Sequence, residues 1–163
     1  MTTFCKIGPE EAARLSEIAS RVVKAHFDPL IGPAQNDYMI EKFQSEPAIR
    51  AQLAGGYRYY WVMEEGETAG FLAFYPREGK LYLSKFYLLE EFRGRGLAGK
   101  MFAFVAESAR AEGLSAVYLN VNRGNTGVIR VYEHLGFQIV REEKNDIGGG
   151  FFMDDYVMEC PLT

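Results

Sequence analysis

The chain has 163 residues, of which 48% are hydrophobic and 25% charged, and its formal net charge is -4. This length and composition are typical of one globular domain with a full hydrophobic core, and they exclude a disordered or low-complexity chain. The acidic balance argues against nucleic acid as a partner, because phosphate binding needs clustered lysine and arginine.

The first half of the chain begins with the alternating stretch Thr3–Ile7, which predicts a strand. A proline and two acids at Pro9–Glu11 favour the start of a helix, whose apolar stripe reaches His26. A second helical stretch covers about Asn36–Phe43, and its extension to Leu53 is left open. The start of the chain does not resemble a signal peptide and no apolar run is long enough to cross a membrane, so we expect a cytoplasmic protein without a membrane partner.

Strands dominate the centre of the chain, and helices alternate with strands after it. Three aromatic and β-branched runs at residues 57–65, 68–76 and 80–90 predict an antiparallel meander. The helical period is clearest over residues 96–112, and a strand is expected at 115–121. Asn125 is expected to cap a helix that ends near Leu135. Two strands, at residues 137–143 and 151–160, then flank an expected loop at Lys144–Gly150.

A glycine-rich stretch, Gly94–Lys100, lies between the third run and the best helix. It fits the nucleotide triphosphatase pattern G-x-x-x-x-G-K, but Met101 stands where a Ser or Thr must hold magnesium. It also fits the dinucleotide pattern G-x-G-x-x-G, but Asn120 and Asn122 occupy the region where an acid for the ribose is expected. Glycines before a helix N-terminus still favour an anion, and we interpret the stretch as a pyrophosphate site.

Two motifs lie between Leu81 and Val140. The first is the loop Arg93–Ala98, RGRGLA, and the second is the segment Asn125–Phe137, NTGVIRVYEHLGF. Together they resemble the GNAT-type N-acetyltransferase superfamily. The resemblance implies an α+β fold with a central mixed, mostly antiparallel sheet of about seven strands, flanked by helices and splayed between the fourth and fifth strands. The final segment GGGFFMDDYVME is similar to bacterial members near the polyamine acetyltransferases.

The same resemblance assigns the binding of acetyl-CoA and two catalytic roles. The Leu88 amide would polarise the thioester carbonyl, and Tyr132 would be the general acid that protonates the departing thiolate. Two simpler readings stay open, in which Tyr132 is a core aromatic and Asn125 only caps its helix. The residues expected to bind the cofactor are Phe86, Leu88, Arg93, Gly94, Arg95, Gly96, Leu97, Ala98 and Asn125.

The general base is left unassigned, because Ser84 and Lys85 stand where many members of the superfamily carry a glutamate. Neither residue is a convincing base, so the proton could pass through water to an acid elsewhere. His26 is expected to be partly buried and His134 exposed. The acids considered are Asp28, Asp154 and Asp155.

The expected activity is acetyl transfer from acetyl-CoA to a primary amine by direct attack in a ternary complex, in a single N-acetyltransferase domain over residues 1–163. Cys5 and Cys160 are expected to be reduced packing residues and not nucleophiles, and no metal is expected. The acidic balance favours a small cationic amine or a polyamine as the partner. Two alternatives stay open: acetylation of a protein N-terminus or lysine, and a non-catalytic acyl-CoA-binding regulatory domain. The sequence also leaves a homodimer open.

Overall fold

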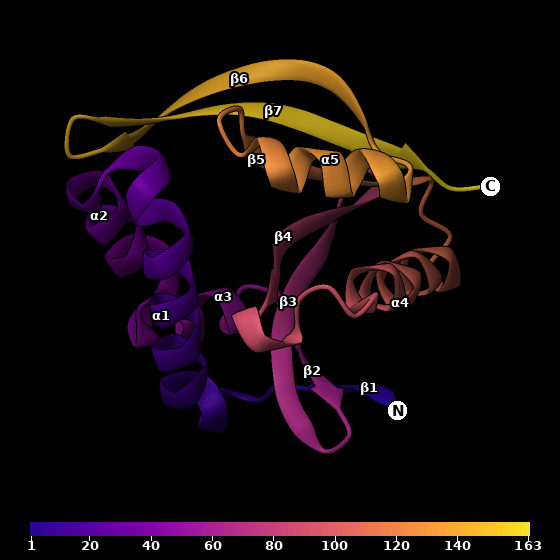
Figure 1. Cartoon of the computed structure of the whole chain (residues 1–163). Helices are drawn as coiled ribbons and strands as arrows, with labels where there is room; N and C mark the ends of the chain where they lie inside the picture. Colours follow the sequence, from indigo (N-terminus) through magenta and orange to yellow (C-terminus); the bar gives the residue numbers. More distant parts are fainter.

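The computed structural model describes residues 1–163 and contains one mixed sheet of seven strands in the order β1-β2-β3-β4-β5-β7-β6 (Figure 1). Neighbouring strands are antiparallel except for β4 and β5, which are parallel. This topology confirms the expected α+β fold. The strands are β1 (Thr2–Lys6), β2 (Arg58–Glu64), β3 (Glu67–Arg77), β4 (Lys80–Leu88), β5 (Ala116–Asn122), β6 (Gln138–Gly148) and β7 (Phe151–Pro161).

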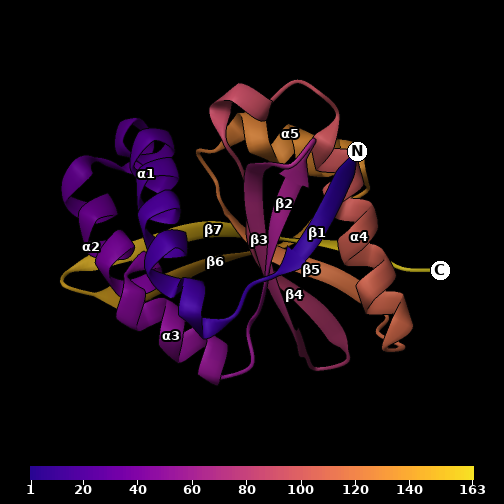
Figure 2. The ribbon, with the colours of Figure 1, turned by 90° about the horizontal axis from the view of Figure 1, so that it is seen from below.

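Five α-helices cover the sheet in two groups (Figure 2). The larger core joins the sheet to α4 and α5 and includes Met101 and Leu119. The smaller core joins β2 and β3 to α1 and α3 and includes Leu15, Ile49 and Phe71. None of these helices combines the length and apolar character needed to cross a membrane. The helices are α1 (Ala12–Ile31), α2 (Pro33–Gln44), α3 (Glu46–Ala54), α4 (Leu97–Ala111) and α5 (Thr126–Leu135).

The second helical stretch consists of two helices, because Ser45 interrupts it. The backbone of Ser45 is extended, with ψ at 158°, and its hydroxyl accepts a hydrogen bond from the Ala48 amide at 3.3 Å. Ser45 therefore caps α3, and a proline in the first helical turn, Pro47, needs no amide hydrogen bond there. Cys5 also differs from its expected packing role, because its side chain on β1 is exposed, whereas Cys160 is buried.

The β6–β7 hairpin is longer than the sequence predicts, and the expected loop at Lys144–Gly150 is wrong. Residues up to Gly148 extend β6, where Lys144 pairs with Asp154. The stretch did not look like a strand because β6 is an exposed edge strand without apolar alternation. Glycines 148, 149 and 150 all have positive φ angles and make the turn. The Tyr38 hydroxyl of α2 donates to the Ile147 carbonyl at 2.8 Å, so the hairpin tip is fastened to α2 (Figure 1).

Strands β4 and β5 pair only near their starts, where Leu81 lies opposite Val117 and Tyr82 opposite Tyr118. Beyond these pairs the two strands separate, which confirms the expected splay. Each strand therefore has a free backbone edge inside the sheet, which an extended ligand can pair with.

A β-bulge at Ser84 changes which side chains of β4 face which core. Lys85 lies opposite Ala73 and Leu83 opposite Phe74, so Ser84 has no partner on β3. The extra residue reverses the alternation of side chains along the strand. Phe86 consequently packs against the same core as Leu83, and Lys85 points toward α2 and α3. Such bulges are common beside active sites, where they redirect side chains.

Gly70 keeps β3 close to the last residues of β4, and we expect Gly70→Ala to destabilise the fold by about 1 to 3 kcal/mol. A Cβ atom at this position would lie 2.1 Å from the Tyr87 carbonyl oxygen, so β4 would have to move. Urea unfolding measures the effect. The control is Gly99→Ala in α4, where a Cβ atom meets nothing within 4 Å and helix propensity favours alanine. Equal unfolding midpoints for the Gly70→Ala protein and its parent would contradict the prediction.

Candidate active site

A cleft of about 1300 Å³ runs through the opening between β4 and β5. At one end it is lined by the loop after β4 and by the starts of α4 and α5, and at the other by α1, α2 and the β6–β7 hairpin. Pockets for one small ligand usually have volumes of roughly 300 to 1,000 Å³. A continuous cleft of this size has room for two substrates that meet at the splay.

The loop after β4 has the geometry of an anion site. Gly94 and Gly96 have φ angles of 76° and 77°, a left-handed conformation that residues with a side chain adopt only at a cost. Gly96 is also the N-cap of α4, and no side chain caps this helix. The first amides of α4 are therefore free for a negatively charged ligand, and the exposed Arg93 lines the cleft beside them.

The structure brings most of the expected cofactor residues together along the cleft. Arg95 is the exception, because its guanidinium lies over the Phe92 ring at 5.1 Å and does not line the cleft. Leu97 lines the cleft although its side chain is buried in the larger core. The expected residues that line the cleft are Phe86, Leu88, Arg93, Gly94, Gly96, Leu97, Ala98 and Asn125.

The backbone of β4 presents free amides to the cleft. The Leu89 amide donates to the Ala69 carbonyl at 2.8 Å, so it faces β3. Amides alternate in direction along an antiparallel strand, and the Leu88 amide therefore faces the splay, as does the Phe86 amide. Because β5 has already diverged there, both amides can pair with an extended ligand.

Tyr132 of α5 has its ring in the larger core and its hydroxyl at the cleft. The ring centroid lies 5.9 Å from that of Phe86 and 5.5 Å from that of Phe137. No protein group forms a hydrogen bond with the hydroxyl, and burial raises the pKa of Tyr132. The phenol is therefore protonated at neutral pH, which a proton donor requires. Packing of the Tyr132 ring in the core is therefore compatible with a catalytic role for its hydroxyl.

Asn125 occupies the N-cap position of α5 as expected, but its side chain does not cap the helix. Its backbone carbonyl accepts from the Ile129 amide at 3.0 Å, but its side chain makes no capping hydrogen bond. Its Oδ1 atom instead lies 3.2 Å from Nε2 of His26, which is half-buried as expected. Both side chains line the cleft and join α1 to α5.

Lys85 is buried with its charge held away from any carboxylate. Its Nζ atom donates to the Phe43 carbonyl at 2.8 Å and to the amide oxygens of Gln44 and Gln52 at 2.9 and 3.1 Å. Burial lowers the pKa of Lys85 to about 7. Three oxygen acceptors nevertheless use all the N–H groups of an ammonium, so the residue joins β4 to α2 and α3 and is poorly placed as a base.

Among the three candidate acids, only Asp155 lines the cleft. Asp28 is paired with Lys24 at 3.0 Å, and Asp154 is paired with Arg123 at 3.0 Å. Asp155 is only 1% exposed, and burial raises its pKa to about 6. His134 is exposed as expected. No group of three or more His, Cys, Asp or Glu side chains lies in an arrangement that could hold a metal ion.

The fold of the chain also occurs in solved N-acetyltransferases. The PaiA N-acetyltransferase from Thermoplasma acidophilum, solved in complex with coenzyme A, matches 99% of both chains with a TM-score of 0.81 at 17% identity. Residues 21–137 match the model of the acetyltransferase (GNAT) family. The chain therefore belongs to the GNAT family of acetyltransferases.

Curated relatives match the chain over shorter segments. An uncharacterized N-acetyltransferase of Escherichia coli, YjgM, is 39% identical over 84 residues, which are 48% of this chain and 50% of the relative. The spermine/spermidine N(1)-acetyltransferase of Bacillus subtilis is 29% identical over 91 residues, which are 50% of this chain and 60% of the relative. The chain thus spans about half to three fifths of the length of these relatives.

Proposed function

We propose that the protein transfers the acetyl group of acetyl-CoA to a primary amine by direct attack in a ternary complex. The observation that carries this proposal is the continuous cleft, which connects the anion loop with the far side of the sheet through the splay. A cofactor bound on the α4 and α5 side can meet an acceptor that enters from the α1 and α2 side. A domain that only binds acyl-CoA does not need this second opening.

The backbone supplies most of the proposed cofactor contacts. The amides of Gly94–Ala98 would hold the pyrophosphate, because Gly94 and Gly96 are left-handed and no side chain caps the start of α4. The Arg93 amide is not free for this role, since it donates to the Glu90 carbonyl at 3.1 Å. The Phe86 and Leu88 amides would pair with the pantetheine arm as a missing strand would. Arg93 lies at the loop to complement the charge, whereas Arg95 acts at most at long range.

Two groups would act on the reacting atoms. The Leu88 amide, fixed by the strand before the reaction, would donate to the thioester carbonyl as negative charge develops on its oxygen. The Tyr132 hydroxyl would protonate the leaving thiolate. Neither cysteine lines the cleft, which supports direct attack by the amine without a covalent enzyme intermediate.

The proposed acceptor is a small cationic amine. The net charge of -4 favours cations over anions near the protein, and one curated relative is named as a polyamine acetyltransferase. Acetylation of a protein N-terminus or lysine has no specific contact in the structure that favours it over a small amine.

Amine-dependent release of free thiol tests this function. We expect the protein to release one coenzyme A thiol for each N-acetylated product, which mass spectrometry detects, when acetyl-CoA is mixed with a panel of primary amines. Mixtures without amine are the control for hydrolysis. A protein that binds coenzyme A in calorimetry but releases no thiol with any amine would be a binding domain, and the proposal would be wrong.

A further inference from the structure

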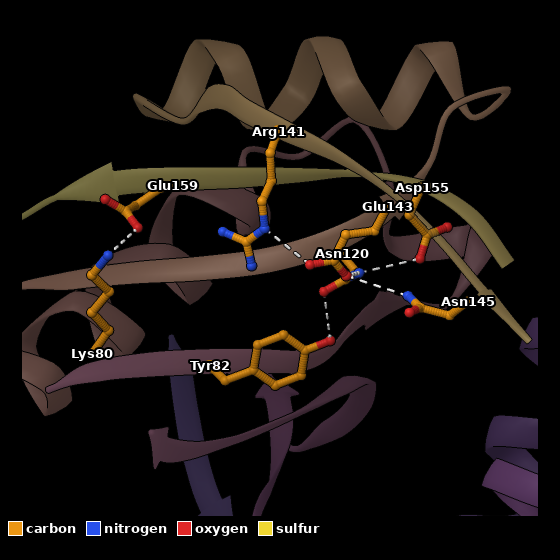
Figure 3. A network of polar contacts seen from close by, with 8 residues as sticks. All are labelled: Lys80, Tyr82, Asn120, Arg141, Glu143, Asn145, Asp155 and Glu159. Carbon is orange, nitrogen blue, oxygen red and sulfur yellow. Dashed lines mark hydrogen bonds and ion pairs between the residues drawn. The ribbon is translucent and has the colours of Figure 1, made fainter. Parts of the chain in front are cut away.

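A polar network lies at the base of the splay, beside the last pair of β4 and β5 (Figure 3). The Tyr82 hydroxyl donates to Oδ1 of Asn120 at 3.1 Å, which fixes the orientation of the carboxamide. The Asn120 NH₂ group then faces two carboxylates, Glu143 at 3.1 Å and Asp155 at 3.4 Å. Four strands thus contribute to one preorganised site that the sequence motifs do not include.

Asp155 differs from the other acids of this region because it is buried and has no cationic partner. Glu143 is paired with Arg141 at 3.0 Å, and Glu159 with Lys80 at 2.7 Å (Figure 3). Asp155 accepts one hydrogen bond, from Asn120, through Oδ2, and its Oδ1 atom is left without a partner. Asp155 lines the cleft and its Oδ1 atom is not fully enclosed, so a ligand cation can pair with this carboxylate and offset the cost of its burial.

Four tyrosines form an aromatic wall in the same cleft. Their ring centroids follow one another at 4.7 Å from Tyr57 to Tyr75, 5.3 Å from Tyr75 to Tyr82, and 4.9 Å from Tyr82 to Tyr118. All four line the cleft, and Tyr82 belongs to the network that orients Asn120. Aromatic faces next to a carboxylate suit a cation that carries an apolar or aromatic body.

In the part of the cleft away from the anion loop, the number of unpaired buried acids matches a ligand with one positive charge. Apart from Arg93 at the loop, four basic and four acidic side chains line the cleft. Two of the acids are already paired and Glu78 is exposed to solvent, so Asp155 alone offers a buried charge to a ligand. A polyamine, with several ammonium groups, would find no further unpaired buried acid. The eight side chains are Arg77, Lys80, Lys85, Arg141, Glu78, Glu143, Asp155 and Glu159.

We propose that Asp155 and the tyrosine wall (Tyr57, Tyr75, Tyr82 and Tyr118) form the acceptor subsite, which takes a primary amine with one ammonium group on an aromatic body. This inference rests on the proposed acetyl transfer and narrows its acceptor. The Asp155 carboxylate binds the ammonium group and takes one proton from it, so that the nitrogen lone pair becomes free to attack.

The step balances with the groups already described. The C–N bond forms as the thioester C–S bond breaks, and the thiolate takes the Tyr132 proton. The nitrogen loses its second proton to water, from which Tyr132 is reprotonated, and Asp155 releases its proton to solvent. The net products are the N-acetylated amine, the free thiol and one proton.

Three amines of different shape and charge test the acceptor class on the full chain with saturating acetyl-CoA. We expect phenethylamine to give a kcat/KM at least about tenfold above those of n-butylamine and spermidine, because only phenethylamine combines one charge with a ring for the tyrosine wall. Tyr75→Leu should reduce the preference for phenethylamine over n-butylamine. A parent enzyme that prefers spermidine would overturn the inference and leave the proposed acetyl transfer intact, whereas no thiol release with any amine would overturn both.

The Asp155→Asn protein tests the carboxylate. We expect its KM for phenethylamine to rise about tenfold or more while its affinity for coenzyme A is unchanged, because a charge-assisted hydrogen bond is lost. The matched control is Asp154→Asn, the exposed neighbour paired with Arg123, which should change either constant by less than about twofold. Unchanged kinetics in the Asp155→Asn protein would overturn the assignment.

The melting temperature of the Asp155→Asn protein gives a second readout. The proposed ligand-binding role predicts a rise in melting temperature, whereas a purely structural role predicts a fall. Burial raises the pKa of Asp155 to about 6, above the ordinary value of 3.8. The Asn120 hydrogen bond and Arg123 lower this pKa, and Glu143 and Asp154 raise it further. The folded protein therefore loses stability as the pH rises from about 4 to 6, where the carboxylate ionises. At pH 7, Asp155→Asn should raise the melting temperature and lower acceptor use. A lower melting temperature would mark Asp155 as a structural residue and overturn the proposal.

Discussion

Tyr132→Phe is expected to lower kcat by about 10²- to 10⁴-fold and to leave the affinity for coenzyme A nearly unchanged. Phenylalanine keeps the ring that packs between Phe86 and Phe137, and it removes only the hydroxyl that lines the cleft without a protein partner. The hydroxyl is needed when the thiolate leaves, so its removal should affect the rate more than binding. A binding domain would show no rate loss of this kind.

The matched control is Tyr60→Phe, which removes a hydroxyl from a tyrosine that packs on the same core outside the cleft. Steady-state thiol release should be parental in this control, and thermal melts should show both variants folded. A parental kcat for Tyr132→Phe, measured where chemistry limits turnover, would reject the general-acid role and leave the cofactor site intact.

Gly96→Val is expected to weaken coenzyme A binding by about 100-fold or more while the protein still folds. The φ angle of 77° at Gly96 is strained for a β-branched residue, so the loop must change its conformation and the first amides of α4 would turn away. A hydrogen bond to a charged group contributes about 1.5 to 3 kcal/mol, and the loss of two accounts for this factor.

Calorimetric titration with coenzyme A measures the effect, and Gly99→Ala is the control because Gly99 lies in α4 without a positive φ angle. The control should bind coenzyme A as the parent does. Unchanged affinity in a folded Gly96→Val protein would mean that the loop does not hold the pyrophosphate, since the backbone geometry of the loop would then be irrelevant to binding.

The sequence predicted the structure best at positions where the backbone conformation restricts which residue type can occur. Gly94 and Gly96 are glycines because the loop needs positive φ angles, and this requirement appears as a local pattern. Strands β2 (Arg58–Glu64) and β3 (Glu67–Arg77) were recognisable as the runs at residues 57–65 and 68–76, because buried strands are rich in aromatic and β-branched residues. The splay was expected only from the resemblance, since no local pattern in β4 or β5 marks where their pairing stops.

The acceptor side could not be derived from the sequence, because its groups come from separate strands. Asp154 and Asp155 are equivalent as a dipeptide, yet alternation along β7 exposes one and buries the other. The alternation of side chains in β5 places Tyr118 and Asn120 on one face of the sheet. No local sequence pattern indicated that Tyr82 of β4 and Glu143 of β6 would contact Asn120 on that face. Lys85 could not be placed either, because the bulge at Ser84 reverses the faces of β4.

Because β4 and β5 stop pairing early, the free energy of unfolding depends on whether a ligand occupies the space between them. Two residue pairs between β4 and β5 connect the two halves of the sheet. The rest of the β4 edge has no strand partner there, and a bound pantetheine would supply the missing hydrogen bonds. A ligand that binds only the folded state at 100 times its Kd adds about 2.7 kcal/mol to the free energy of unfolding. The concentration of the proposed cofactor would then affect the rigidity of the sheet as well as the supply of acetyl groups. Loss of the cofactor would loosen the strands that line the candidate active site.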